Sequence, residues 1–215
     1  MQSFKDEFRT GNRQPTTPAE AGSVTVHGDE ETKVVGKEHA YYRKGVGKLL
    51  HMTCWSRPEI QNAVRDLSRH GSAPTQSHIK AMHRSMEYCL GTEERGWLLR
   101  PSRQWDGKNK NFKFRIHKMS DLDYAKCLKT RRSGSVYATF LEGALVNVKS
   151  SMQKVVALSV TKAEMIAGVQ CAQDMIYVKR VLEGLGLQVE TPMVLYMDNS
   201  GAVDLVNNWT AGINL

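Results

Sequence analysis

The sequence predicts an α/β (α+β) chain in which a small helical segment precedes a mixed sheet flanked by helices. Between residues 38 and 97, apolar side chains recur at intervals of three and four, as in the stripe of Ile60, Ala63, Val64 and Leu67. From Phe112 onward, apolar and polar residues alternate in short runs, a pattern typical of strands. The polar residues 101–111 lie between the two patterns and predict a linker.

The first part of the chain divides into two predicted segments. Residues 1–37 are polar, with Gly, Pro and Thr clusters and no sustained period, which predicts a flexible lead-in. Residues 38–100 predict three short helices, with a capping box at Ser56–Glu59. Four histidines have no ligand-like spacing, and we interpret them as surface or packing residues; they are His51, His70, His78 and His83. We interpret Trp55 and Trp97 as core residues rather than base-stacking platforms.

The second part, residues 112–215, predicts a sheet domain. Strands are expected at 112–120, around Val136–Phe140 and at 145–149, with a tight turn at Glu142 and Gly143 between the last two. A long helix is expected over 162–183, with a break near Gln173 and Asp174. A final strand, 193–197, should then return parallel to the first through this helical crossover.

Three isolated acids are expected to converge in this domain. Asp121 ends the first strand, Glu164 lies in the first turn of the long helix, and Asp198 ends the last strand. Clustered carboxylates suit a hard divalent cation such as Mg²⁺. Each acid also has an ordinary interpretation: Thr161 and Glu164 have capping-box spacing, Asp198 precedes a helix start, and Asp121 or Asp123 could form a turn.

The charge of the chain favours a polyanionic partner. The formal net charge is +8, and residues 108–149 contain ten Lys and Arg against three Asp and Glu, a net +7. A solvated face is the ordinary alternative. The candidate phosphate contacts are Lys126, Lys129, Arg131, Arg132, Lys149 and Lys154.

Cysteine spacing and hydropathy predict where the protein is located in the cell. The four cysteines have no zinc-like or disulfide-like spacing, which predicts an intracellular protein, cytoplasmic or nuclear. No apolar run approaches the ~18 residues of a membrane helix, so no membrane partner is expected.

Several motifs occur in the order found in one known family. They are Met119–Ala125 (MSDLDYA), Thr130–Ser133 (TRRS), Ser150–Glu164 (SSMQKVVALSVTKAE) and Tyr196–Ala202 (YMDNSGA). Together they resemble the ribonuclease H region of copia-type retrotransposon Pol polyproteins. Upstream, Tyr42–Leu50 and Arg57–Ser68 resemble the thumb and connection that follow the reverse transcriptase palm. The resemblance covers roughly residues 10 to 215.

The resemblance implies a ribonuclease H-like fold and hydrolysis of the RNA strand of RNA–DNA hybrids with two Mg²⁺ ions, Mn²⁺ being a possible substitute. Asp121 would bridge both ions, Glu164 would hold the ion on the leaving-group side, and Asp198 the ion with the attacking water; Asp123 is the alternative to Asp121. Expected partners are an RNA–DNA hybrid or another nucleic acid and the rest of a Pol polyprotein. No organic cofactor is expected.

Three departures from the family qualify this expectation. A Tyr-Val-Asp-Asp-like polymerase motif does not occur, so no DNA synthesis is expected. Gly134 precedes Val136 by two residues, where relatives place Gly directly before the aromatic residue of that strand. Relatives continue beyond the region of Trp209 into a His-x-Asp motif and a fifth strand, so the domain is expected to be incomplete at its C-terminus and feeble in hydrolysis. The alternatives are an inactive retroelement remnant that only binds nucleic acid, and an integrase-like or resolvase-like strand transferase.

Overall fold

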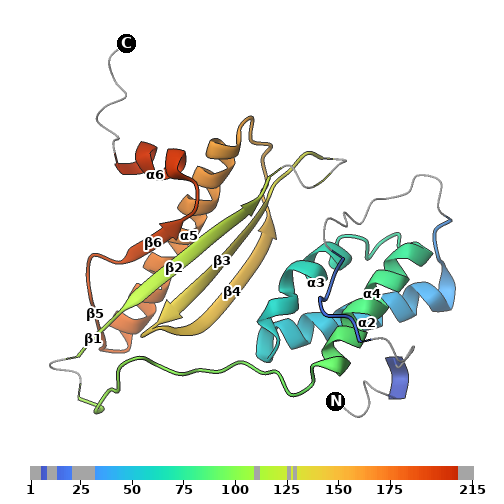
Figure 1. Cartoon of the computed structure of the whole chain (residues 1–215), viewed down its shortest axis with the longest axis horizontal. Helices are drawn as coiled ribbons and strands as arrows, with labels where there is room; N and C mark the ends of the chain where they lie inside the picture. The colour runs from blue at the N-terminus through green and yellow to red at the C-terminus, as the bar shows by residue number, and fades with distance from the viewer. Residues whose placement is uncertain are drawn as a thin grey trace. The chain divides into compact units, whose positions relative to one another are not determined.

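The computed structural model describes residues 6–8, 14–20, 32–108, 112–124, 127 and 130–207. The chain divides into two compact units, Met1–Trp97 and Leu98–Leu215. The first unit is helical and the second combines a sheet with helices (Figure 1). The predicted α/β class is therefore confirmed.

The first unit packs its helices around one apolar core. Its elements are α2 (Gly36–Trp55), the 3₁₀ turn η1 (Pro58–Ile60), α3 (Gln61–Ser68) and α4 (Gln76–Gly91). The predicted stripe lies inside, because Ile60 and Val64 are fully buried against a core that also contains Leu49, Met82 and Met86. Helical periodicity thus located this core correctly.

Two expectations about the first unit are wrong. Ser56–Glu59 forms no capping box, because Glu59 instead accepts a hydrogen bond from Arg57 Nε at 2.5 Å. The buried Arg57 guanidinium also donates to the Cys89 and Thr92 carbonyls, so it satisfies the C-terminal end of α4. Trp55 is 74% exposed and does not belong to the core.

The second unit contains a four-stranded mixed sheet. Its strands are β2 (Ile116–Asp123), β3 (Gly134–Leu141), β4 (Ala144–Met152) and β6 (Val194–Met197), in the order β4-β3-β2-β6. β3 pairs antiparallel with both β2 and β4, and β6 pairs parallel with β2. Glu142 and Gly143 connect β3 to β4 with φ of 50° and 80°, the signature of a tight hairpin turn. The predicted meander, turn and parallel last strand are confirmed.

One long helix covers one face of this sheet. α5 (Val160–Gly184) runs for 25 residues and contacts β2, β3 and β6 (Figure 1). The expected break near Gln173 and Asp174 is wrong, because Asp174 points inward and forms an ion pair with Lys118 of β2. Met175 packs on Ile116 and Val189 in the core of this unit.

Shorter elements complete the unit. β1 (Lys113–Phe114) and β5 (Gln188–Val189) form a separate parallel pair, and α6 (Ser200–Asn207) follows β6. Within the segment expected as a linker, the Arg103 guanidinium forms two hydrogen bonds with the Glu142 carboxylate, at 2.6 and 2.7 Å. These bonds attach Arg103 to the hairpin of the second unit. In the part of the chain that is described, no helix is both long and apolar enough to cross a membrane.

Candidate metal site and nucleic-acid surface

Strand register brings two of the predicted acids to the same end of the sheet. In the parallel pair of β2 and β6, Ser120 lies opposite Met197. Asp121 and Asp198 each follow that pair by one residue, so they lie beside each other where β6 ends. Both are exposed, and one Asp121 carboxylate oxygen accepts the Leu122 N–H at 2.8 Å.

The third acid reaches this end from the helix. Glu164 is the fifth residue of α5, only 4% of its side chain is exposed, and its Oε2 has no hydrogen-bond partner among the described residues. Ser159 caps α5 by accepting the Lys162 N–H at 3.2 Å, so the alternative capping role for Thr161 and Glu164 is wrong. Glu164 therefore has no capping role.

The electrostatics of Glu164 connect it with the other two acids. Burial, followed by the negative charges of Asp198 and Asp121, raises the pKa of Glu164 from 4.5 to about 7. The alternative role of Asp198 as a helix cap is also wrong, because Asn199 Oδ1 accepts the Ala202 N–H at 2.8 Å instead. The three carboxylates are thus electrostatic neighbours at one end of the sheet.

These neighbours do not form a closed ligand shell. Among the described residues, no three His, Cys, Asp or Glu side chains are close enough to hold a metal ion as they stand. The electrostatic influence of Asp121 and Asp198 on Glu164 is compatible with this, because charges interact over far more than the ~2.1 Å of a Mg²⁺–oxygen bond. The chemistry of the set still suits a hard cation, because it offers oxygen donors alone and one buried carboxylate oxygen without a partner.

Part of the predicted basic surface lies near the acids. Ser133, next to Arg131 and Arg132 in sequence, accepts the Gln153 N–H at 2.9 Å, so these arginines and Lys154 lie on adjoining segments. All three are exposed. Lys126 and Lys129 lie outside the described residues.

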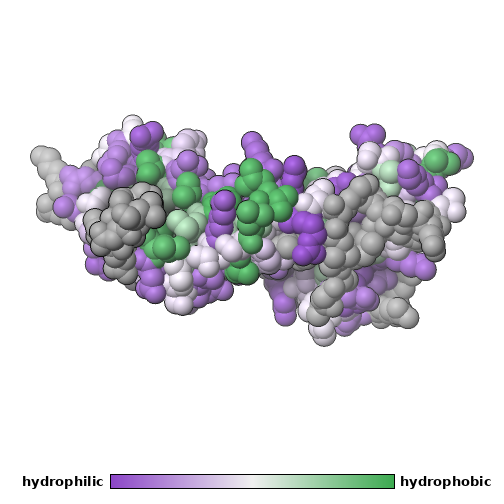
Figure 2. All heavy atoms as spheres, turned by 90° about the horizontal axis from the view of Figure 1, so that it is seen from above, coloured by the Kyte–Doolittle hydropathy of each residue, from purple (hydrophilic) through white to green (hydrophobic). Residues whose placement is uncertain are grey.

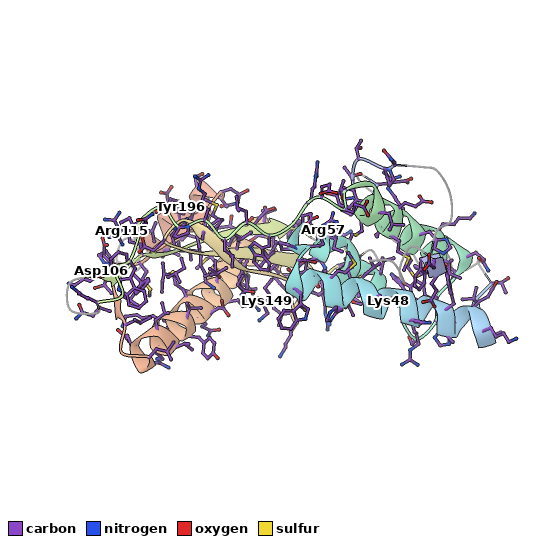
Figure 3. The ribbon with its side chains drawn as sticks, turned by 90° about the horizontal axis from the view of Figure 1, so that it is seen from below. Lys48, Arg57, Asp106, Arg115, Lys149 and Tyr196 are labelled. Carbon is purple, nitrogen blue, oxygen red and sulfur yellow. The ribbon has the colours of Figure 1, made fainter. Side chains whose placement is uncertain are left out.

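Lys149 lies on a different part of the sheet. It projects from the edge strand β4, whereas Tyr196 marks the other edge strand, β6 (Figure 3). Its ammonium group is 5.7 Å from the centre of the Tyr137 ring. Lys149 therefore contributes positive charge along β4.

A buried ion pair beneath the sheet was not anticipated. Lys118 is fully buried, bonds to Asp174 of α5, and lies 4.7 Å from the centre of the Tyr137 ring. Its alternation with Ile116 and Ser120 placed it on the inward face, which was the available signal. The pair connects the strand of Asp121 to the helix of Glu164.

Comparison with known proteins identifies the family. The "Retrovirus-related Pol polyprotein from transposon TNT 1-94" of Nicotiana tabacum is 32% identical over 167 residues, or 78% of this chain. The corresponding polyprotein from transposon RE1 of Arabidopsis thaliana is 31% identical over the same share. The chain belongs to the retrovirus-related Pol polyproteins of copia-type transposons. It spans only 12% and 11% of the length of these two Pol relatives.

A third relative is a short protein. "Secreted RxLR effector protein 161" of Plasmopara viticola is 31% identical over 136 residues, which are 63% of this chain and 89% of that protein. No family model matches the Pol chain, and no solved structure matches it.

Proposed function

We propose that the second unit of this Pol chain is a ribonuclease H-type nuclease that hydrolyses the RNA strand of RNA–DNA hybrids. The supporting observation is the environment of Glu164, a buried carboxyl whose pKa is raised to about 7 by burial and by the charges of Asp198 and Asp121. An acid whose pKa is perturbed by burial and by two neighbouring acids is typical of a functional site. The proposal includes the rest of a Pol polyprotein as partner and an intracellular location, cytoplasmic or nuclear.

Each acid has a role in this proposal. Asp121, Glu164 and Asp198 would hold two Mg²⁺ ions, or Mn²⁺, and bound ions lower the pKa of the attacking water and stabilise the leaving oxygen. Glu164 offers a carboxylate oxygen that no described residue occupies. Asp121 and Asp198 are exposed and so accessible to a phosphodiester. Arg131, Arg132 and Lys154 would bind neighbouring phosphates.

A second candidate function is nucleic-acid binding without catalysis. It is favoured by the absence of a ready metal-holding group among the described residues. In that case the basic surface would act alone, and added ions would change neither stability nor the substrate.

Cleavage and metal binding are measured together to test the proposal. The whole chain is incubated with an RNA–DNA hybrid and Mg²⁺ or Mn²⁺, and its thermal melting is recorded with and without Mn²⁺. We expect at most slow cleavage of the RNA strand, and a higher melting temperature with the ion, because an ion that binds the folded state stabilises it by mass action. Asp121→Asn and Asp198→Asn should lose both effects.

The matched control is Asp106→Asn. Asp106 is an exposed acid of the same unit, and one of its carboxylate oxygens accepts the Lys108 N–H at 2.9 Å. If the parent chain neither cleaves nor responds to Mn²⁺ but still binds the hybrid, the second candidate is correct. If Asp198→Asn melts identically to the parent with and without Mn²⁺, the metal site does not exist.

A further inference from the structure

The outward face of α5 has a row of exposed side chains, most of them apolar. The opposite face of this helix is buried and includes Cys171 and Met175, because α5 contacts β2, β3 and β6 there. On the outward face, every fourth residue is exposed, and four of these five side chains are large and apolar. They are Val169, Gln173, Tyr177, Val181 and Leu185, and we call them the α5 row.

The apolar side chains of the α5 row are open to solvent. Tyr177 is 65% exposed, Leu185 is 69% exposed, and Ile176, which adjoins Tyr177 in sequence, is 44% exposed. On the face of the protein shown in Figure 2, hydrophobic residues instead form separate groups among hydrophilic ones. A contiguous apolar surface along one helix is typical of a site that binds another protein surface.

The spacing of the α5 row is symmetric about Tyr177. Val169 and Leu185 are each eight residues from Tyr177. Gln173 and Val181 are each four residues from it. In an antiparallel pair of these helices with a two-fold axis at Tyr177, Val169 lies opposite Leu185 and Tyr177 lies opposite itself. A two-fold interface requires a surface that is complementary to itself in this way.

Charge is complementary under the same symmetry. Arg180 is the only exposed charged residue from Val169 to Val181, a stretch that the structure describes throughout. Arg180 lies three residues after Tyr177, so it falls opposite Asp174, which lies three residues before Tyr177 and is 23% exposed. A cation of each copy therefore meets an acid of the other copy, which favours this pairing over one that brings like charges together.

The dimensions of the α5 row suit a helix pair. Residues spaced four apart form the ridges that pack into the grooves of a second helix in the commonest class of helix packing. The row is roughly 24 Å long by the rise of an α-helix. Two rows of side chains of this size and exposure would bury roughly 1,000 Å² in total, the lower limit for a specific interface. The expected contact is therefore weak and reversible.

We propose that the α5 row binds the α5 row of a second copy of this chain, with the two helices antiparallel about a two-fold axis at Tyr177. This dimer does not depend on the nuclease proposal. Glu164 lies thirteen residues before Tyr177, roughly 20 Å along the helix, and is buried on the side of the sheet. The dimer therefore leaves the candidate acids uncovered.

Sedimentation velocity of the whole chain over a series of concentrations tests the proposal. We expect a monomer–dimer equilibrium with a dissociation constant in the micromolar range. Tyr177→Ser should weaken the dimer roughly 100-fold, because both copies lose the aromatic side chain at the centre of the interface. Leu158→Ser is the matched control, since Leu158 is 86% exposed in the loop between β4 and α5, and this variant should dimerise as the parent does.

Cysteine cross-linking tests the position of the axis. A residue on a two-fold axis faces its own copy, so Tyr177→Cys should form a disulfide-linked dimer under mild oxidation. Both cross-linking variants carry Cys54→Ser, because Cys54 is the exposed native cysteine whereas the other three are buried. Val206→Cys, at an exposed position of α6, is the control and should cross-link far more slowly.

The other outcomes overturn the proposal. If the parent chain is monomeric at every concentration, the α5 row does not bind a second copy, and the rest of the Pol polyprotein becomes the candidate partner. If the parent dimerises but Tyr177→Ser weakens the dimer no more than Leu158→Ser, another surface forms the dimer. Equal rates of cross-linking for Tyr177→Cys and Val206→Cys contradict the axis. Each of these results leaves the nuclease proposal standing.

Discussion

The Glu164 side chain is unusual because its folded environment disfavours its charge. The pKa in the folded chain, about 7, lies above the ordinary 4.5, so the folded state binds more protons between these two values. The free energy of unfolding must therefore fall as the pH rises from about 4.5 to about 7 and level off above that range. Without a bound cation, ionised Glu164 makes the second unit less stable.

Glu164→Gln should remove this penalty. In the presence of a chelator, we expect the variant to exceed the parent in stability by up to about 3 kcal/mol at pH 8, and to lose most of that advantage at pH 5. Hydrogen exchange of α5 amides at the two pH values measures the difference within the second unit. Asp106→Asn should follow the parent at both pH values. A difference between Glu164→Gln and the parent that is the same at pH 5 and pH 8 contradicts the assignment.

Two glycines of α2 differ in the space that is available for a side chain. A Cβ at Gly45 would collide with Met82 Sδ and lie 2.7 Å from Met86 Cε, whereas a Cβ at Gly47 would meet nothing within 4 Å. Gly47→Ala should therefore stabilise the first unit by up to about 1 kcal/mol through helix propensity. Gly45→Ala should lose part or all of that gain, because the ends of the flexible Met82 and Met86 side chains must shift to make room for the added Cβ. Thermal melting of both variants decides this, and equal melting temperatures would disagree with the packing described.

At the scale of elements, the Lys118–Asp174 ion pair connects β2 to α5. Lys118 is fully buried and Asp174 is 23% exposed, so removal of Asp174 alone leaves a buried cation without its partner. We expect Asp174→Leu to destabilise the second unit by about 3 kcal/mol, and Lys118→Met combined with Asp174→Leu to recover most of that loss. Hydrogen exchange of β2 and α5 amides measures both variants. Additive losses in the double variant would show that the two residues do not interact.

The elements differ in how far the sequence predicts them. Strand alternation predicted the meander, and the Glu-Gly dipeptide predicted its hairpin turn, because both depend on local backbone preferences. The break expected at Asp174 was wrong. The partner of this acid, Lys118, is 56 residues away in the sequence, so the local pattern around Asp174 could not reveal the ion pair. Arg57 satisfying the end of α4 is likewise a contact between distant segments, from residue 57 to residue 92.

The candidate site shows the same division. The position of Asp198 just after β6 could be inferred from periodicity. The expectation that Asp121 ends its strand or forms a turn is wrong, because β2 continues to Asp123 and Asp121 pairs with Val136 inside it. The parallel register of β2 and β6 then brings Asp121 and Asp198 together. The burial of Glu164 could not be predicted from the sequence. Its lack of a capping role could not be predicted either, because Ser159 and Thr161 are equivalent candidates for the N-cap of α5 in the sequence. Local pattern predicts which element holds a residue, whereas packing decides its environment.

At the scale of the whole molecule, charge is unevenly divided between the two units. Leu98–Leu215 contains sixteen Lys and Arg against ten Asp and Glu, a net +6, while Met1–Trp97 has fourteen against twelve, a net +2. In the first unit, Lys44 and Lys48 both pair with Glu7. We therefore expect a polyanion to bind to the second unit rather than to the first.

Neutralising exposed charge on the second unit should lower the salt dependence of binding. Each phosphate contact on duplex DNA contributes about −0.9 to the slope of log K against log salt, because it releases condensed counterions. We expect Arg131→Gln combined with Arg132→Gln to make the slope shallower by nearly twice that amount, while Lys48→Gln, in the first unit, leaves it unchanged. Fluorescence anisotropy with a labelled duplex over a salt series measures the slopes. A change of equal size per charge removed in the arginine pair and in Lys48→Gln would mean that the net charge of the chain, rather than this surface, determines binding.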